Sequence, residues 1–188
     1  MILNKLSLLL AERQLKVTTV ANATKISRTT LTALMKNESK MIQFDTINSL
    51  CLFLEVEPKD FFDFVPYNFS YHFDSEDELV YDPNTHPLTY KANGIINIID
   101  PVDGDFLFEY NGLLTDFGGD ISVYLEPAGE LMAEVAESFF SGIPKSFITL
   151  IEKEFREHIE KSILEEGYNV FSCDVSLNLT SLRNKRAN

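Results

Sequence analysis

The segment VANATKISRTTLTALMKN, residues 20–37, restricts the possible folds of this chain more than any other stretch. Its large apolar residues are Val20, Ile26, Leu31 and Leu34. A single amphipathic helix would repeat such residues every three or four positions, and this segment does not. Ser27 suits the start of a new helix, because its hydroxyl can accept hydrogen bonds from the free amides of a first turn. The pattern predicts two short helices, over residues 18–24 and 28–36, joined by a tight turn at Lys25 and Ile26.

Three further helices are predicted around this pair. The first covers residues 4–13, where leucines recur on one helical face. Asp45 is expected to cap a fourth helix, which carries apolar residues through Leu54. Pro58 favours the start of a short fifth helix, because its fixed φ suits the first helical turn. Asn37 is expected to end the third helix.

The third predicted helix has two different faces. Ile26, Leu31 and Leu34 lie on one side and are expected to pack against the core. The opposite face carries side chains that are short or basic, namely Arg28, Thr29, Thr32, Ala33 and Lys36. A helix that enters the major groove of DNA needs such a face, because its first residues reach base edges while flanking amides and cations hold phosphates.

Residues 2–66 resemble the Cro/repressor-type (XRE-type) helix-turn-helix family of bacteria and phages. The resemblance is carried by LLAERQL, VANATKISRTTLTALMKN and IQFDTINSLCLFLEVEPKDFF. It implies an all-α five-helix domain like that of lambda repressor, and binding to double-stranded DNA. The chain departs from the family at Lys25, where glycine is usual, and at Val17, where many relatives have glutamine. The phosphate contact of that glutamine is therefore expected from Lys16, Thr18 or Thr19.

The expected DNA-binding residues lie on the second and third helices and beside them. They are Lys16, Thr18, Thr19, Lys25, Ser27, Arg28, Thr29, Thr32, Ala33, Lys36 and Asn37. Arg28 is the expected reader of guanine, because its planar fork matches the O6 and N7 acceptors. Lys16, Lys25 and Lys36 flank the reading helix and are expected to neutralise phosphates. The alternative is that this five-helix unit mediates only protein contacts.

The sequence changes character after VPYNF, and a second domain is predicted over residues 67–188. Alternating apolar residues and Gly-containing turns indicate strands over 67–73, 88–100, 105–112, 120–127 and 168–179. A long amphipathic helix is predicted over 144–166, and residues 130–140 are a second candidate helix. The acidic segment 75–78 is expected to be a loop. These elements predict an α+β domain with an antiparallel sheet and one long helix, and no family is recognised for it.

Charge is distributed unevenly along the chain. Residues 1–40 hold seven basic and two acidic residues, whereas residues 67–188 hold eight basic and 22 acidic residues. This asymmetry predicts two modules with different partners. We expect a homodimer on a pseudo-palindromic DNA operator, formed through helix 144–166 or the final strand. The first module is expected to have little apolar surface left for pairing. The alternative use of the acidic module is to bind a protein partner.

No motif for catalysis, metal binding or a cofactor is found. His158 stands alone in REHIEK, so the ligand spacing of a zinc site is missing. Ala128-Gly129 resembles the self-cleavage site of some repressors, but only 59 residues follow it, which is too few for the protease domain. Cys51 and Cys173 are expected to be reduced, buried thiols. No apolar run approaches the ~20 residues that span a bilayer. No signal peptide is recognised, so a cytoplasmic location without membrane contact is expected.

These observations predict a sequence-specific transcriptional regulator, a repressor of bacterial or phage/mobile-element origin, that reads the major groove with helix 27–36. The alternative is an antitoxin-like or anti-repressor protein whose acidic module captures another protein. An enzyme is not expected.

Overall fold

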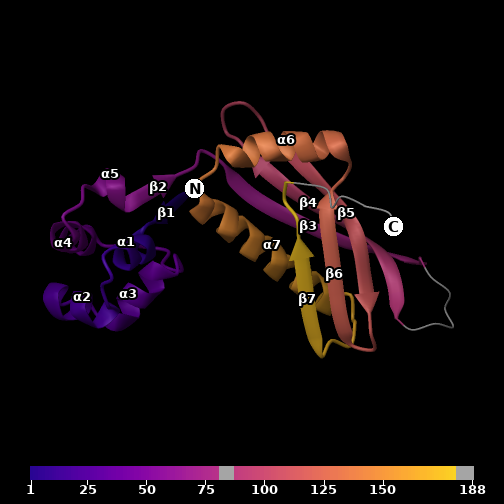
Figure 1. Cartoon of the computed structure of the whole chain (residues 1–188), viewed down its shortest axis with the longest axis horizontal. Helices are drawn as coiled ribbons and strands as arrows, with labels where there is room; N and C mark the ends of the chain where they lie inside the picture. Colours follow the sequence, from indigo (N-terminus) through magenta and orange to yellow (C-terminus); the bar gives the residue numbers. More distant parts are fainter. Residues whose placement is uncertain (81–86, 181–188) are drawn as a thin grey trace. The chain divides into compact units, whose positions relative to one another are not determined.

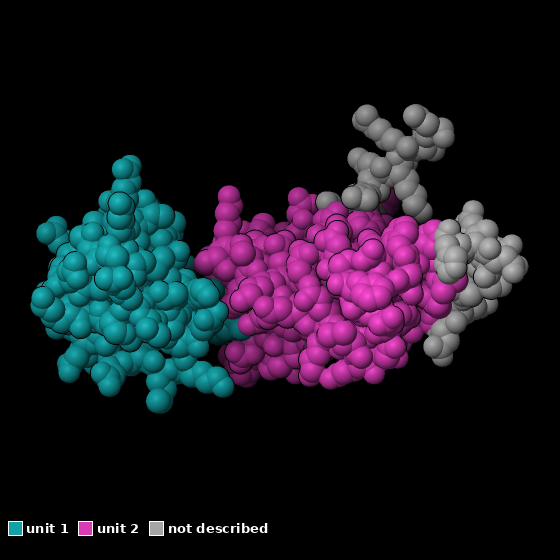
Figure 2. Space-filling model, turned by 90° about the horizontal axis from the view of Figure 1, so that it is seen from below, with its two compact units in different colours: residues 1–66 teal, residues 67–188 magenta. Residues whose placement is uncertain are grey.

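The chain, in a computed structural model, consists of two compact units, Met1–Pro66 and Tyr67–Asn188, which Figure 2 colours separately. The structure describes residues 1–80 and 87–180. Each unit has its own buried apolar core.

The first unit contains helical segments and a two-stranded ribbon (Figure 1). The helices are α1 (Leu6–Glu12), α2 (Val17–Thr24), α3 (Arg28–Met35), α4 (Phe44–Leu54) and α5 (Pro58–Phe61). The ribbon pairs β1 (Ile2–Asn4) antiparallel with β2 (Phe62–Phe64), so that Ile2 lies opposite Phe64. The predicted all-α five-helix bundle is therefore wrong. Residues 62–64 are extended because they pair with residues 2–4, so their backbone groups bond to a distant segment and do not continue helix α5.

Most of the predicted helix ends in this unit agree with the structure. Ser27 caps α3, and its Oγ accepts a hydrogen bond from the Thr30 amide at 3.0 Å. Lys25 ends α2 in the left-handed conformation with φ 64°, a cost of roughly 1 kcal/mol for a residue with a Cβ. Asp45 is not the cap of α4, since the helix starts one residue earlier. Gln43 is its N-cap, and Asp45 lies in the first turn, where its charge suits the helix dipole.

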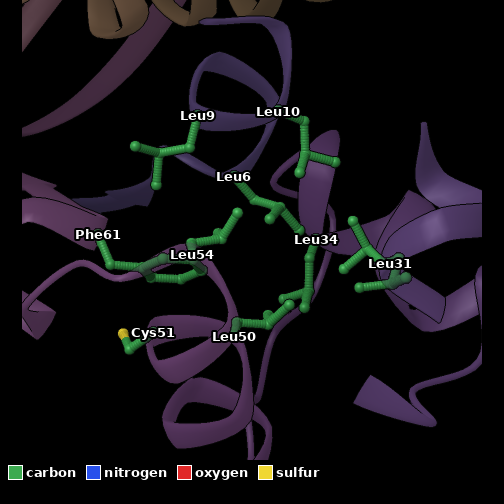
Figure 3. Close-up of a cluster of buried hydrophobic side chains, with 10 residues drawn as sticks. Leu6, Leu9, Leu10, Leu31, Leu34, Leu50, Cys51, Leu54 and Phe61 are labelled. Carbon is green, nitrogen blue, oxygen red and sulfur yellow. The ribbon is translucent and has the colours of Figure 1, made fainter. Parts of the chain in front are cut away.

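Side chains from all five helices form the core of the first unit. Figure 3 shows leucines of α1, α3 and α4 pointing toward one another and toward Phe61 of α5. Leu31 and Leu34 of α3 are 0% and 1% exposed. Ile26, in the α2–α3 turn, packs against the same cluster, as its place in the sequence predicted.

The second unit is a five-stranded sheet with two helices (Figure 1). Its elements are β3 (Asn68–Leu79), β4 (Leu88–Ile99), β5 (Phe106–Asp116), β6 (Asp120–Pro127), α6 (Glu130–Ser141), α7 (Lys145–Glu165) and β7 (Ser172–Leu177). The spatial order of the strands is β3-β4-β5-β6-β7. The first four strands are antiparallel neighbours, and β7 is parallel to β6.

The structure corrects the predicted antiparallel sheet with one long helix. β7 pairs in parallel with β6, because the chain between them crosses over through two helices and so returns in the same direction. The acidic segment 75–78, expected as a loop, continues strand β3. Its register against β4 shifts after Ser75, which marks a bulge or irregularity at the acidic stretch.

Helix α7 covers one face of the sheet with its apolar stripe. Every fourth residue faces the strands, and each of these is 0% exposed: Phe147, Ile151, Phe155, Ile159 and Ile163. Gly94 in β4 makes room for one of them, since a Cβ there would lie 2.6 Å from the Phe155 ring. The Tyr71 ring of β3 stacks on the same phenylalanine at 5.5 Å between ring centroids. The apolar stripe of α7 is thus buried against the sheet of its own unit.

Candidate nucleic-acid interface

Helix α3 separates its residues as a DNA-reading helix would need. Leu31 and Leu34 anchor one face in the core. The other face exposes Arg28, Thr29, Thr32 and Lys36, with Ala33 half-buried between them. Short hydroxyl and methyl groups on this face leave room for close approach of a large partner, and Arg28 in the first turn projects furthest.

The start of helix α2 contributes a second group of predicted residues. Lys16 is its N-cap, and Thr18 and Thr19 are exposed in its first turn. Val17, the first residue of the helix, packs against the core. The first amides of a helix have no partner within it, so this end offers both backbone donors and a cation to an anion.

The cations of the first unit fall into two groups. Lys5 pairs with Asp63 at 3.4 Å, Lys59 pairs with Glu57 at 2.7 Å, and Lys36 reaches Glu38 only at 4.0 Å. Within residues 1–80 and 87–180, none of Lys16, Lys25 and Arg28 forms an ion pair. Arg13, at the end of α1, and Lys40, between α3 and α4, also lack an ion pair in these residues. Lys16, Lys25 and Arg28 are grouped at the start of α2, in the turn after it and on α3.

The side chains of two predicted residues are already occupied inside the domain. Ser27 Oγ bonds both the amide and, at 2.8 Å, the hydroxyl of Thr30. Asn37 Oδ1 accepts hydrogen bonds from the backbone and side-chain nitrogens of Asn4 at 2.8 and 2.6 Å. Ser27 thus caps α3 locally, and Asn37 joins the end of α3 to β1. Lys16, Thr18, Thr19, Lys25, Arg28, Thr29 and Thr32 are exposed.

A groove beside α3 was missed by the sequence reasoning. It has a volume of about 440 Å³ and lies between the start of α3 and the start of α4. Lys25, Ser27 and Thr30 line one side, and Gln43 and Thr46 line the other. Residues of α4 are brought to the interface only by tertiary packing, so no local pattern could show it. The available sequence signal was Gln43, a polar residue directly before a predicted helix, which could have indicated that the start of this helix lies beside α3.

The first unit also exposes more apolar surface than expected. Met41, Phe44 and Leu52 are 90%, 88% and 70% exposed. A surface groove of about 670 Å³ is lined by Phe44, Leu52 and other residues of α4 together with residues 56–58, whereas Met41 lines the groove beside α3. The expectation that this unit has little apolar surface to spare is therefore wrong. The helices are too short to bring every apolar residue of the chain into one core.

Other classes of site were sought in the described part of the chain. Among residues 1–80 and 87–180, no group of three or more His, Cys, Asp or Glu side chains is placed to hold a metal ion. In the same residues, no helix is long and apolar enough to cross a membrane. Cys51 is buried and Cys173 half-buried, both are free thiols, and burial raises the pKa of each.

Comparison with known proteins assigns only the first unit. No curated protein and no solved structure matches the chain significantly. Residues 5–67 match the family model of the Cro/C1-type HTH DNA-binding domain, which identifies the first unit as a helix-turn-helix DNA-binding domain and supports a role for the chain as a DNA-binding regulator.

Proposed function

We propose that the chain is a sequence-specific transcriptional repressor of bacterial or phage/mobile-element origin that acts in the cytoplasm. The observation that carries this proposal is the division of α3 into a buried face and an exposed one with Arg28 in the first turn. Repression follows if the bound protein occupies a promoter. Under this proposal the chain is not an enzyme and requires no cofactor.

The residues of the interface take different roles. Arg28 reads guanine through its guanidinium fork. Lys16, Lys25 and Lys36 neutralise phosphates on either side of the reading helix. The remaining open residues of the predicted set, Thr18, Thr19, Thr29, Thr32 and Ala33, supply hydroxyls and close contacts. Ser27 and Asn37 act indirectly: Ser27 caps the helix that carries the others, and Asn37 joins its end to β1.

We propose further that the chain binds a pseudo-palindromic operator as a homodimer through residues 67–188. The α7 stripe cannot supply the interface, because the sheet already buries it. The face of β4 and β5 turned away from the helices is more suitable, since Ile99, Leu107 and Leu113 there are 38%, 43% and 41% exposed. Among the outward residues of β4 and β5, only Lys91 and Glu109 are charged, in a unit with 22 acidic residues. Depletion of charge is typical of protein interfaces.

A second candidate function rests on the acidity of the second unit. Its 22 acidic residues against eight basic ones would suit capture of a basic protein, as in an antitoxin-like or anti-repressor protein. The first unit would then place this complex on DNA. The two candidates differ in whether the chain alone is sufficient for specific binding.

Selection of duplexes from a random pool by the full-length protein tests both candidates. A self-sufficient dimeric repressor should enrich an inverted repeat whose half-sites lie about one helical turn, or ~10 base pairs, apart. Enrichment of a single unrepeated site would contradict the dimer. A pool that stays unselected would contradict specific reading by the chain alone and favour the partner-dependent alternative. The enriched sequence is called the selected duplex below, and a scrambled duplex of equal composition is its reference.

A further inference from the structure

Two side-chain amides join strand β1 to the end of helix α3. The backbone amide and Nδ2 of Asn4 both donate to Oδ1 of Asn37, at 2.8 and 2.6 Å. In return, Nδ2 of Asn37 donates to the Asn4 carbonyl oxygen at 3.2 Å. We call this pair of residues, Asn4 and Asn37, the amide clasp.

Asn4 extends the clasp to two helices. Its Nδ2 also donates to the Leu34 carbonyl in the last turn of α3 at 2.8 Å. Its Oδ1 accepts from the amide of Leu6, the first residue of α1, at 3.1 Å. Asn4 is only 8% exposed. Movement of α3 relative to α1 would leave these buried polar groups without partners, and that is costly in a site closed to water.

The end of α3 does not itself require an asparagine side chain. Asn37 has φ 54°, its amide donates to Leu34, and the Glu38 amide donates to Ala33. These two bonds are the Schellman arrangement, in which glycine is the preferred residue at this position. Glycine would end the helix with less backbone strain but would make no clasp. The asparagine therefore serves the contact with β1.

We infer that the amide clasp sets the position of α3 along its own axis and thereby the register in which Arg28 meets a base pair. This inference rests on the proposed reading of DNA by α3. The Ser27 cap is local to α3, and the buried contacts of Leu31 and Leu34 mainly orient its face. A helix advances 1.5 Å per residue, so a small axial shift is enough to misplace a bidentate contact. Asn4 and Asn37 are positioning residues, since their side chains act through α3.

A role confined to stability would give a different result from positioning. Loss of stability lowers the folded fraction, and all duplexes then bind less protein by the same factor. Loss of position affects only binding that depends on base contacts. The ratio of affinities for the selected and scrambled duplexes therefore distinguishes the two roles, provided that the protein is folded at the assay temperature.

The test is Asn37→Gly in the full-length chain, with binding to both duplexes measured by fluorescence anisotropy. We expect affinity for the selected duplex to fall about tenfold, the cost of one misplaced base contact, while affinity for the scrambled duplex stays within twofold. Glu55→Gly is the matched control, because Glu55 is exposed, ends α4 with φ 53°, and makes no side-chain hydrogen bond in the described part of the chain. It should leave the ratio unchanged.

Asn37→Asp provides the conservative comparison. Its carboxylate still accepts from both Asn4 donors, but its second oxygen faces the Asn4 carbonyl oxygen in place of an N–H donor, so the clasp is weakened and the ratio should fall between those of the parent and Asn37→Gly. A parental ratio in Asn37→Gly would overturn the inference. If Asn37→Gly is unfolded, a folded aspartate variant with the full parental ratio would overturn it as well. A parent protein that binds both duplexes equally would instead contradict the proposed function.

Discussion

The two units carry eight basic residues each but use them differently. In the second unit, Lys91, Lys153 and Lys161 lie 3.1, 3.6 and 3.4 Å from carboxylate oxygens. In the first unit, the cations of α2, α3 and their turn have no such partner in the described residues. Each unit pairs three of its basic residues with carboxylates, and in the described residues Lys145 and Arg156 of the second unit also lack an ion pair. The units differ in their acidic residues, seven in the first and 22 in the second, and in the grouping of Lys16, Lys25 and Arg28 around the reading helix.

The units also differ in how their helices bury apolar residues. The second unit packs a helix of 21 residues along a sheet, and the apolar stripe of that helix is fully buried. The first unit packs five short helices around one small core. Both units leave large apolar side chains exposed, such as Phe44 and Leu52 in the first and Leu131 and Phe171 in the second. A small domain buries a smaller share of its surface, so this exposure does not by itself identify an interface.

Phe155→Ala should have the largest effect. It should destabilise the second unit and leave the stability of the first unit unchanged. Phe155 is fully buried between Gly94, Tyr71 and Tyr110, and its removal leaves a cavity. We expect the second unit to lose about 3–5 kcal/mol of its free energy of unfolding. Hydrogen exchange measured by mass spectrometry on the full chain would locate the loss.

Leu164→Ala on the same helix is the control for this change, because that side chain is 61% exposed. It should alter exchange in the second unit only slightly. Equal loss of protection in α1–α5 after Phe155→Ala would show that the two units unfold together, and the comparison between them would then fail.

Arg28→Ala should weaken specific DNA binding, which would assign base reading to the first unit. We expect it to cost about 1–3 kcal/mol of binding free energy on the selected duplex and to relax preference at one base pair. Lys59→Ala is the control in the same unit, since Lys59 is paired with Glu57. Equal losses on the selected and scrambled duplexes would make Arg28 a phosphate contact rather than a base reader.

Local sequence signals predicted the helices of the first unit well because each signal acts within one turn. Ser27, Lys25 and Pro58 fix helix ends through their own backbone or side chain, and the structure places all three at ends. The errors arose where distant residues decide the outcome. The ribbon joins residues about 60 positions apart, such as Leu3 and Asp63. The parallel pairing of β7 likewise depends on a crossover that no local pattern reports.

The candidate site shows the same division. The exposure of Arg28, Thr29 and Thr32 follows from helical periodicity, because Leu31 and Leu34 lie on the opposite face. The sequence alone was sufficient to predict this exposed face. The hydrogen bonds between Asn4 and Asn37, and the groove between α3 and α4, could not be predicted from the sequence. Both depend on contacts between residues that are distant in the chain.

A pair of double variants compares the units as dimer interfaces. Leu107→Ser with Leu113→Ser removes exposed apolar groups from the outer sheet face of the second unit. Phe44→Ser with Leu52→Ser does the same on α4 of the first unit. We expect the sheet-face variant alone to weaken the dimer, by roughly 1–2 kcal/mol for the partly exposed area removed. Sedimentation equilibrium of the full-length proteins would measure it. Weakening by the α4 variant alone would place the interface in the DNA-binding unit.

The smallest expected effect concerns the uncompensated cations. Lys16→Ala and Lys25→Ala should each lower the slope of log affinity against log salt by about one, because each lysine releases one counterion from a phosphate. Lys36→Ala should change the slope less, since Glu38, 4.0 Å away, already offsets part of its charge. Lys153→Ala in the second unit is the matched control: its ammonium is paired with Glu157 at 3.6 Å, and the slope should not change. The slopes come from titrations of the scrambled duplex, where base contacts contribute least. If Lys153→Ala lowers the slope as much as Lys16→Ala, the second unit touches DNA, and the division of charge between the units has no functional meaning.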